Sequence, residues 1–270
     1  MPVHPWNKEF TWQTPPGPYR RITDAQARQW DDDGYFLLED ALDPDALARV
    51  TEAIDPFEER STEWLREQGG TMFIADADAI TFTTHLVTRS PVVREFAASD
   101  AFADLNHDLI GPDTRLYWDQ AVYKKPESPK EFPWHQDNGY TFVEPQQYLT
   151  CWVPLVDATV DNGCPWVAPG KHREGTLEHW LTPVGFQCLE NPVDAVPVEA
   201  PAGSVVVFSS LTPHRTGPNV STATRKAYIL QYAPDGAIAL KGDAPAPPAE
   251  RLPQDDPDRQ FAVLRDGVPA

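Results

Sequence analysis

Cysteine is scarce in this sequence and forms no pattern. The 270 residues include Cys151, Cys164 and Cys188, an odd number with no CxxC spacing. Disulfide frameworks and cysteine zinc sites need paired cysteines at characteristic spacings, so the sequence argues against both. We expect Cys151 and Cys164 to be buried as small apolar residues.

Long apolar runs are missing as well. No stretch approaches the roughly 18 uninterrupted apolar residues of a membrane helix. The first ten residues, MPVHPWNKEF, lack the charged region and apolar run of a signal peptide. These observations predict a protein of the reducing cytoplasm with no membrane partner.

Basic residues are few. The 22 lysines and arginines face 41 acidic residues, which gives a formal net charge of −19. A surface this acidic repels phosphate backbones and anionic lipids, so nucleic acid and membranes are excluded as expected partners. It also disfavours a highly anionic substrate unless a local basic pocket overrides the overall field. We therefore expect a small-molecule partner.

Glycine is also sparse, with 15 residues against 29 prolines, a balance that suits turns and short strands. Residues 1–20 are predicted to form an irregular arm, and residues 21–112 a mainly helical flank. Helices are expected from Thr23 to Gly34, from Asp43-Pro44 onward with Leu47, Val50 and Ile54 on the apolar face, and from about Pro91 to Leu109.

The pattern changes after residue 112. Strand-forming segments separated by turn residues occur at 115–124, 148–158, 203–210 and 225–234. Because no helical pattern alternates with them, they predict an antiparallel sandwich or barrel over residues 113–240. Residues 241–270 are expected to be a tail that is extended or wraps the surface, and the whole chain is expected to be one domain.

Three residues form a candidate metal site. In PWHQDNGY, His135 and Asp137 stand two apart, and on a strand such residues point to the same face. His214, just after the apolar strand GSVVVFSS, is the best third ligand. Two histidines and one carboxylate leave three coordination positions open, the facial triad of non-haem iron(II) oxygenases. The same ligands also suit zinc, so a zinc hydrolase remains an alternative.

Arg225 extends this reading. It lies eleven positions after His214, at the start of the next strand. A guanidinium grips a carboxylate through two parallel hydrogen bonds, as an oxygenase needs for the distal carboxylate of 2-oxoglutarate. The combination predicts 2-oxoglutarate and dioxygen as co-substrates beside iron(II).

The segment from about Asp33 to Pro234 resembles the phytanoyl-CoA dioxygenase family of iron(II)/2-oxoglutarate oxygenases. The matching motifs, in order, are DGYFLLEDALDPDAL, WHQDNGY, YLTCWVPLVDATVDNGCPWVAPGKHREG and PAGSVVVFSSLTPHRTGPNVSTATRKAY. The resemblance implies a mostly β fold, the double-stranded β-helix or jelly-roll barrel, with N-terminal helices packed outside. The whole of residues 1–270 is then a single oxygenase domain.

The resemblance also implies roles for individual residues. His135, Asp137 and His214 would bind iron and form the catalytic centre, and Arg225 would bind 2-oxoglutarate with Thr216. Trp152, Gln120 and Ala121 would border the same co-substrate. Because Asp137 is present, whereas related halogenases lack this carboxylate, halogenation is not expected.

The expected reaction is hydroxylation of a C–H bond in a small apolar or amphipathic metabolite, with release of succinate and CO2. An acyl-CoA thioester, which the family name suggests, is the alternative substrate; the net charge and the absence of a basic cluster near the pocket segments favour the first, although four basic residues could still receive an anion: Lys124, Lys125, Lys171 and Arg173. A non-catalytic jelly-roll binding protein is a third possibility. His172 is expected to be structural, and no role is assigned to Trp134, Trp166 or Trp180.

Overall fold

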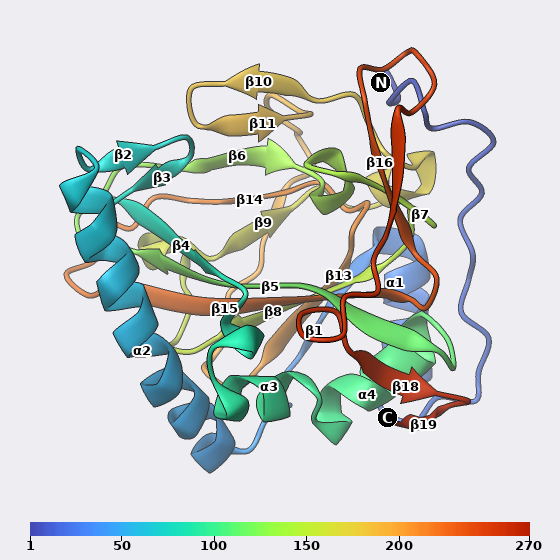
Figure 1. The fold of residues 1–270 in the computed structure, drawn as a ribbon, viewed down its shortest axis with the longest axis horizontal. Coiled ribbons are helices and arrows are strands. Elements are labelled where there is room, and N and C mark those ends of the chain that lie inside the picture. The colour runs from blue at the N-terminus through green and yellow to red at the C-terminus, as the bar shows by residue number, and fades with distance from the viewer.

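Antiparallel strands dominate the computed structural model, which describes residues 1–270 (Figure 1). The larger sheet follows the order β1 (Tyr35–Leu38), β13 (Val205–Ser209), β8 (Leu149–Pro154), β15 (Arg225–Pro234), β5 (Thr114–Lys124), β4 (Ile80–Thr84), β3 (Ala75–Asp76) and β2 (Thr71–Met72). The smaller sheet follows the order β12 (Val196–Pro197), β9 (Pro165–Val167), β14 (His214–Thr216) and β6 (Phe132–His135). The two sheets form the predicted jelly-roll, as two layers in Figure 1.

Shorter strands complete the fold. One hairpin pairs β10 (Trp180–Thr182) with β11 (Gly185–Gln187), and β16 (Ile238–Lys241) lies between β7 (Phe142–Glu144) and β17 (Glu250–Pro253). Four 3-10 turns connect the strands: η1 (Leu86–Thr88), η2 (Asp137–Gly139), η3 (Val160–Asn162) and η4 (Lys171–Glu174).

The first two helices begin where capping residues predict. In α1 (Asp24–Asp33), the Thr23 side chain accepts from the Gln26 N–H, and Gly34 ends the helix at φ 80°. In α2 (Pro44–Glu67), the Asp43 side chain accepts from the Ala46 N–H. The predicted face of α2 is buried, with Leu47, Val50 and Ile54 at or below 8% exposure.

The helical stretch predicted from Pro91 to Leu109 is interrupted. It divides into α3 (Pro91–Ala97) and α4 (Asp100–Leu109), because Ser99 adopts the extended conformation of an N-cap residue, with φ −65° and ψ 155°. None of the helices combines the length and apolar character needed to cross a membrane.

Strand alternation sorts side chains between two cores. On β8, Cys151 and Val153 belong to the core under the helices, whereas Trp152 belongs to the core between the sheets. On β5, Tyr123 faces the helices and Val122 the barrel interior. Successive side chains on a strand point to opposite faces, so this parity decides which residues reach the inside of the barrel.

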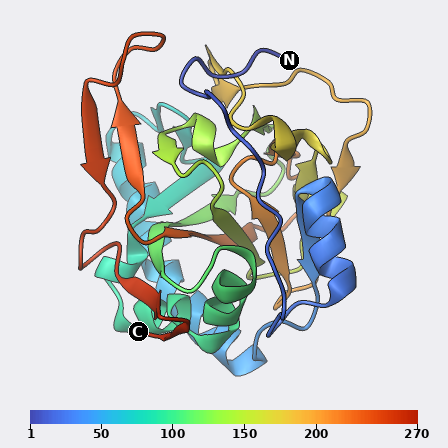
Figure 2. The ribbon, with the colours of Figure 1, turned by 90° about the vertical axis from the view of Figure 1, so that its right-hand side faces the viewer.

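Both terminal segments are held against the rest of the molecule. The N-terminal arm runs along one side of the molecule in Figure 2. Asp108, which is buried, fixes its end by accepting from the backbone N–H groups of Arg20, Arg21 and Ile22 at 2.7–3.1 Å. The C-terminal segment predicted as a tail contains β17, β18 (Ala262–Arg265) and β19 (Val268–Pro269), and β18 pairs with β5.

A buried carboxylate joins the helical layer to the larger sheet. Asp119 Oδ2 accepts from the N–H groups of Leu86 and Val87 at 2.7 and 3.3 Å, and from the Tyr228 hydroxyl at 3.0 Å. Its Oδ1 has no partner. Burial raises the pKa of Asp119 to about 6, despite these donors.

Replacement of Asp119 by Asn should therefore flatten the pH dependence of stability. Because the pKa of Asp119 is higher in the folded protein than in the unfolded chain, the folded protein binds the carboxyl proton more tightly. Protonated Asp119 therefore stabilises the fold at low pH, and this contribution is lost as the pH rises toward 6. Two pKa units correspond to roughly 3 kcal/mol of unfolding free energy at most. Urea unfolding of wild type and Asp119→Asn between pH 4 and 8 measures this difference.

The exposed Asp255 provides the matched control. Asp255→Asn should follow the wild-type pH profile. If Asp119→Asn also runs parallel to wild type across that range, the carboxylate does not titrate as its burial predicts.

Candidate metal centre

Strand pairing brings the two predicted histidines together. His135 ends β6 and His214 begins β14, and they are register partners in the smaller sheet. Their ring centroids are 4.1 Å apart. The sequence suggested that Asp137 lies on the same strand as His135, but the strand ends at His135 and Asp137 begins the 3-10 turn η2. The turn still directs its carboxylate to the histidines.

The three side chains converge on one point. Asp137 Oδ1 lies 3.9 Å from His135 Nε2 and 3.8 Å from His214 Nε2. One ligand atom from each residue lies within 4.8 Å of the other two, so a single ion could contact all three. All are largely buried, which limits access by bulk water.

Backbone carbonyls orient both imidazoles. The ring Nδ1 of His135 lies 2.9 Å from the Pro133 carbonyl oxygen, and that of His214 lies 3.0 Å from the Thr212 oxygen. When Nδ1–H donates to a carbonyl, Nε2 is left with a lone pair for a metal. Burial lowers the pKa of His135, which favours the neutral ligand form.

Thr150 orients the carboxylate. Its hydroxyl donates to Asp137 Oδ2 at 2.5 Å, which leaves Oδ1 facing the histidines. The sequence pointed to Trp152 but not to Thr150. Thr150 could have been found from its position two residues before Trp152 on β8, because residues two apart on a strand face the same side, here the barrel interior.

Arg225 is fully buried with unused hydrogen-bonding capacity. It begins β15, and Nη1 donates to the Val122 carbonyl at 2.9 Å. Nε and Nη2 have no partner, and the guanidinium carbon lies 5.3 Å from the Trp152 ring centroid. Burial lowers the pKa of Arg225 only to about 9, so it remains a cation at neutral pH.

Two unpaired N–H groups on a buried cation are costly unless a ligand accepts from them. A carboxylate matches both their charge and their geometry. The donor set of Arg225 therefore fits the distal carboxylate of 2-oxoglutarate, and the two histidines with Asp137 fit a divalent metal.

All seven predicted site residues line one cavity of about 50 Å³, which we call the metal cavity. Its wall contains His135, Asp137, His214, Arg225, Thr216, Trp152 and Gln120, together with Thr150, Phe132, Phe208, Ile80, Phe82, Val122, Pro165 and Ile229. The Gln120 side-chain oxygen accepts from Trp118 Nε1 at 3.2 Å. Ala121 does not belong here, because alternation on β5 turns it into the core under the helices.

Three of the four basic residues suggested as anion receivers are already engaged. The buried Lys124 donates from Nζ to the carbonyl oxygens of Lys130, Thr216 and Gly217. Lys125 pairs with Glu58 at 2.7 Å, and Arg173 with Asp31 at 2.7 Å. Apart from Lys171, for which no such contact occurs, the residues expected to receive an anion serve the fold.

Other singled-out residues lie outside the metal cavity. His172 Nε2 lies 3.1 Å from the Asp31 carbonyl oxygen and its ring packs against Trp12 at 4.3 Å, a structural position as expected. Trp134 and Trp166 lie against the Arg215 guanidinium, at 5.6 and 5.0 Å, and Trp180 is exposed on β10.

A further histidine that the sequence did not single out lies behind the metal ligands. His179 Nε2 accepts from the Gln136 N–H at 3.0 Å, and its Nδ1 lies 2.9 Å from the Leu177 oxygen. A Cβ on Gly139 would lie 2.1–2.4 Å from this ring. Both ring nitrogens are therefore used, and His179 supports the HxD segment without acting as a fourth ligand.

Structural comparison finds solved structures with the same fold. The epimerase SnoN, crystallised with Fe3+, alpha ketoglutarate and nogalamycin RO, aligns with a TM-score of 0.69 at 20% identity, over 89% of this chain and 98% of the other. EctD from S. alaskensis, with 2-oxoglutarate and 5-hydroxyectoine, aligns with a TM-score of 0.67 at 21% identity, over 94% and 96%.

Sequence comparison gives the family. Phytanoyl-CoA dioxygenase of Arabidopsis thaliana is 28% identical over 146 residues, about half of each chain (52%). Ectoine dioxygenase of Bordetella bronchiseptica is 25% identical over 234 residues, covering 77% of this chain and 74% of that protein. The model of the phytanoyl-CoA dioxygenase family matches residues 30–227. Because that match spans well over half of the 270 residues, this chain belongs to the phytanoyl-CoA dioxygenase family of non-haem iron, 2-oxoglutarate-dependent oxygenases, as its motifs predicted.

Proposed function

We propose that this chain hydroxylates a C–H bond of a small apolar or amphipathic metabolite, with His135, Asp137 and His214 holding iron(II). One atom of dioxygen enters the C–H bond to give an alcohol. The other enters 2-oxoglutarate, which loses CO2 and becomes succinate. The observation that carries this proposal is the buried Arg225, whose Nε and Nη2 lack partners in the same cavity as the three ligands.

Each residue has a distinct task in this proposal. Bound iron(II) supplies the activation of dioxygen that carbon hydroxylation requires. His135 and His214 present Nε2, Thr150 holds Asp137 so that Oδ1 faces the histidines, and Arg225 anchors the distal carboxylate of 2-oxoglutarate. Thr216, Trp152 and Gln120 complete the wall around that co-substrate.

The alternatives lack comparable support. A zinc hydrolase would use the three ligands but gives no reason for a buried guanidinium with two free donors. A non-catalytic binding protein has no need to retain the complete triad. The case for an acyl-CoA substrate is weaker because Lys124, Lys125 and Arg173 already form contacts within the fold.

We also propose that residues 1–270 act as one oxygenase domain in the cytoplasm. The main core cluster contains residues from α1, α2, α4, β5, β15 and β18, so the helical flank and the C-terminal strands share one core with the barrel. The three cysteines are free and buried, as a reducing compartment permits.

Loss of the guanidinium should weaken co-substrate binding selectively. Arg225→Gln removes the charge and one of the two unpaired donors. Hydrogen bonds to a charged group contribute about 1.5–3 kcal/mol each, so the affinity for 2-oxoglutarate should fall roughly 100-fold. Calorimetric titration of the manganese(II)-loaded protein measures it, and metal content should stay at the wild-type level. Unchanged affinity for 2-oxoglutarate would remove Arg225 from the site.

Loss of the carboxylate ligand should abolish turnover. Asp137→Ala removes the only anionic protein ligand, so metal affinity should fall and succinate formation should be lost. Metal analysis of the freshly purified wild type, together with oxygen consumption, separates an iron oxygenase from a zinc hydrolase. Zinc content without oxygen uptake would contradict the proposed function.

Removing the hydroxyl that orients Asp137 should weaken the metal site without disturbing the fold. Thr150→Val keeps the side-chain shape but deletes the hydrogen bond to Oδ2, and loss of such a supporting contact lowers metal affinity about 10–100-fold. Competition with a fluorescent chelator measures the change. Thr150→Ser, which keeps the hydroxyl, should bind metal like wild type; equal affinity in all three proteins refutes this role of Thr150.

A further inference from the structure

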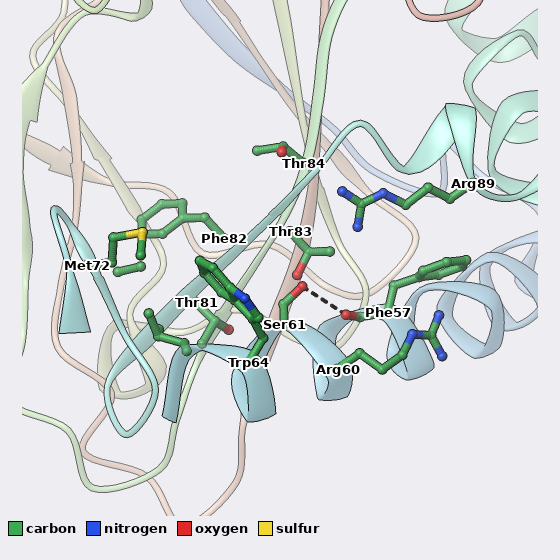
Figure 3. A pocket seen from close by; sticks show the side chains of 12 residues that line it. Phe57, Arg60, Ser61, Trp64, Met72, Thr81, Phe82, Thr83, Thr84 and Arg89 are labelled. Atoms are coloured by element: carbon green, nitrogen blue, oxygen red, sulfur yellow. Dashed lines mark hydrogen bonds between the residues drawn. The ribbon is translucent and has the colours of Figure 1, made fainter. Parts of the chain in front are cut away.

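A second cavity, of about 440 Å³, lies between α2 and the edge of β4, and we call it the outer cavity (Figure 3). It is several times larger than the metal cavity of about 50 Å³ and falls within the range of small-molecule sites. Its wall comprises Phe57, Arg60, Ser61, Trp64, Leu65, Met72, Ala75, Thr81, Phe82, Thr83, Thr84 and Arg89.

The two cavities meet at β4. Phe82 lines both of them, and alternation places Ile80, Phe82 and Thr84 on the same face of the strand. Thr84 is the register partner of Gln120, which lines the metal cavity. Strand β3 pairs with β4 only at Asp76 and Ile80, so the edge of β4 beyond Ile80 is open toward the outer cavity.

The wall of the outer cavity has the opposite charge from the rest of the chain. It contains two arginines and no acidic residue, although acidic residues outnumber basic ones by 41 to 22 in the chain. Neither Arg60 nor Arg89 forms an ion pair, whereas Arg66, on the same helix as Arg60, pairs with Asp78 at 2.9 Å. Figure 3 shows the Arg89 guanidinium directed toward Thr83 and Thr84.

A buried hydroxyl adds a second polar group without a partner. Thr83 is only 1% exposed and lines the outer cavity, yet its Oγ1 makes no hydrogen bond. An anionic oxygen held by Arg89 could accept from this hydroxyl as well. The opposite part of the wall is apolar, with Trp64 at 50% and Met72 at 46% exposure beside Phe82.

We propose that the outer cavity binds the substrate, and that the substrate is an amphipathic organic anion. Its carboxylate or phosphonate group binds Arg89 and Thr83, and its apolar body lies on Trp64, Met72 and Phe82, from which the oxidised carbon reaches the metal cavity. This assignment rests on the proposed oxygenase function. It gives the acidic protein the local basic pocket that an anionic ligand requires.

Binding of simple probes to the full-length protein tests the assignment. Octanoate and octylphosphonate should bind, as measured by calorimetry and tryptophan fluorescence, whereas octan-1-ol and octylamine should bind about tenfold more weakly or not at all. Preference between the two anions identifies the head group. Octan-1-ol binding as tightly as both anions would overturn the anion subsite.

Variants locate the site. Arg89→Gln should weaken binding of the preferred anion about tenfold, and Thr83→Val should weaken it several-fold, with octan-1-ol unaffected. Trp64→Phe should remove most of the fluorescence change while keeping binding. The control is Arg49→Gln, which should bind like wild type, because Arg49 is an exposed arginine of α2 that does not line the cavity. Wild-type affinity in Arg89→Gln and Thr83→Val overturns the assignment.

The two proposals fail in different ways. 2-Oxoglutarate affinity of the manganese(II)-loaded protein, measured on the same variants, should be unchanged by Arg89→Gln. If 2-oxoglutarate binds through Arg225 but neither anion binds, only the substrate site is refuted. If 2-oxoglutarate does not bind, the oxygenase function itself is refuted.

Discussion

The antiparallel pairing of β6 with β14 is the constraint on which the site depends. It places His214 opposite His135 on neighbouring strands, although 78 residues lie between them in the sequence. Backbone hydrogen bonds fix the strand spacing, and carbonyl oxygens of Pro133 and Thr212 fix the ring orientations. The two histidine ligands are thus oriented by main-chain carbonyl groups, whereas the third ligand, Asp137, is oriented by the side-chain hydroxyl of Thr150.

Alternation along the strands of the larger sheet then distributes the remaining roles. The residues facing inward from β5 and β8 include Gln120, Thr150 and Trp152, while their sequence neighbours Ala121 and Cys151 pack beneath the helices. The helical layer stabilises the sheet from outside without reaching the ligands. Structural and chemical demands therefore fall on alternate residues of the same strand.

Much of this could be predicted from the sequence because it depends on local patterns. Thr23, Gly34 and Asp43 mark helix ends through their own backbone contacts, and His135, Asp137, His214 and Arg225 stand at recognisable spacings. The break at Ser99 and the strands after residue 250 depend on packing against distant elements, which spacing does not reveal. The partners of Lys124 and Lys125 also come from distant segments, so their apparent availability in the sequence was misleading.

The separation of the two cavities has an evolutionary consequence. The metal ligands lie on β6, η2 and β14, whereas most of the outer cavity is built from α2, the β2–β3 hairpin and one edge strand. Mutations in the latter elements can reshape what the protein accommodates while the catalytic centre stays intact. On the proposal that the outer cavity holds the substrate, substrate preference could then change through substitutions in α2 and the β2–β3 hairpin alone.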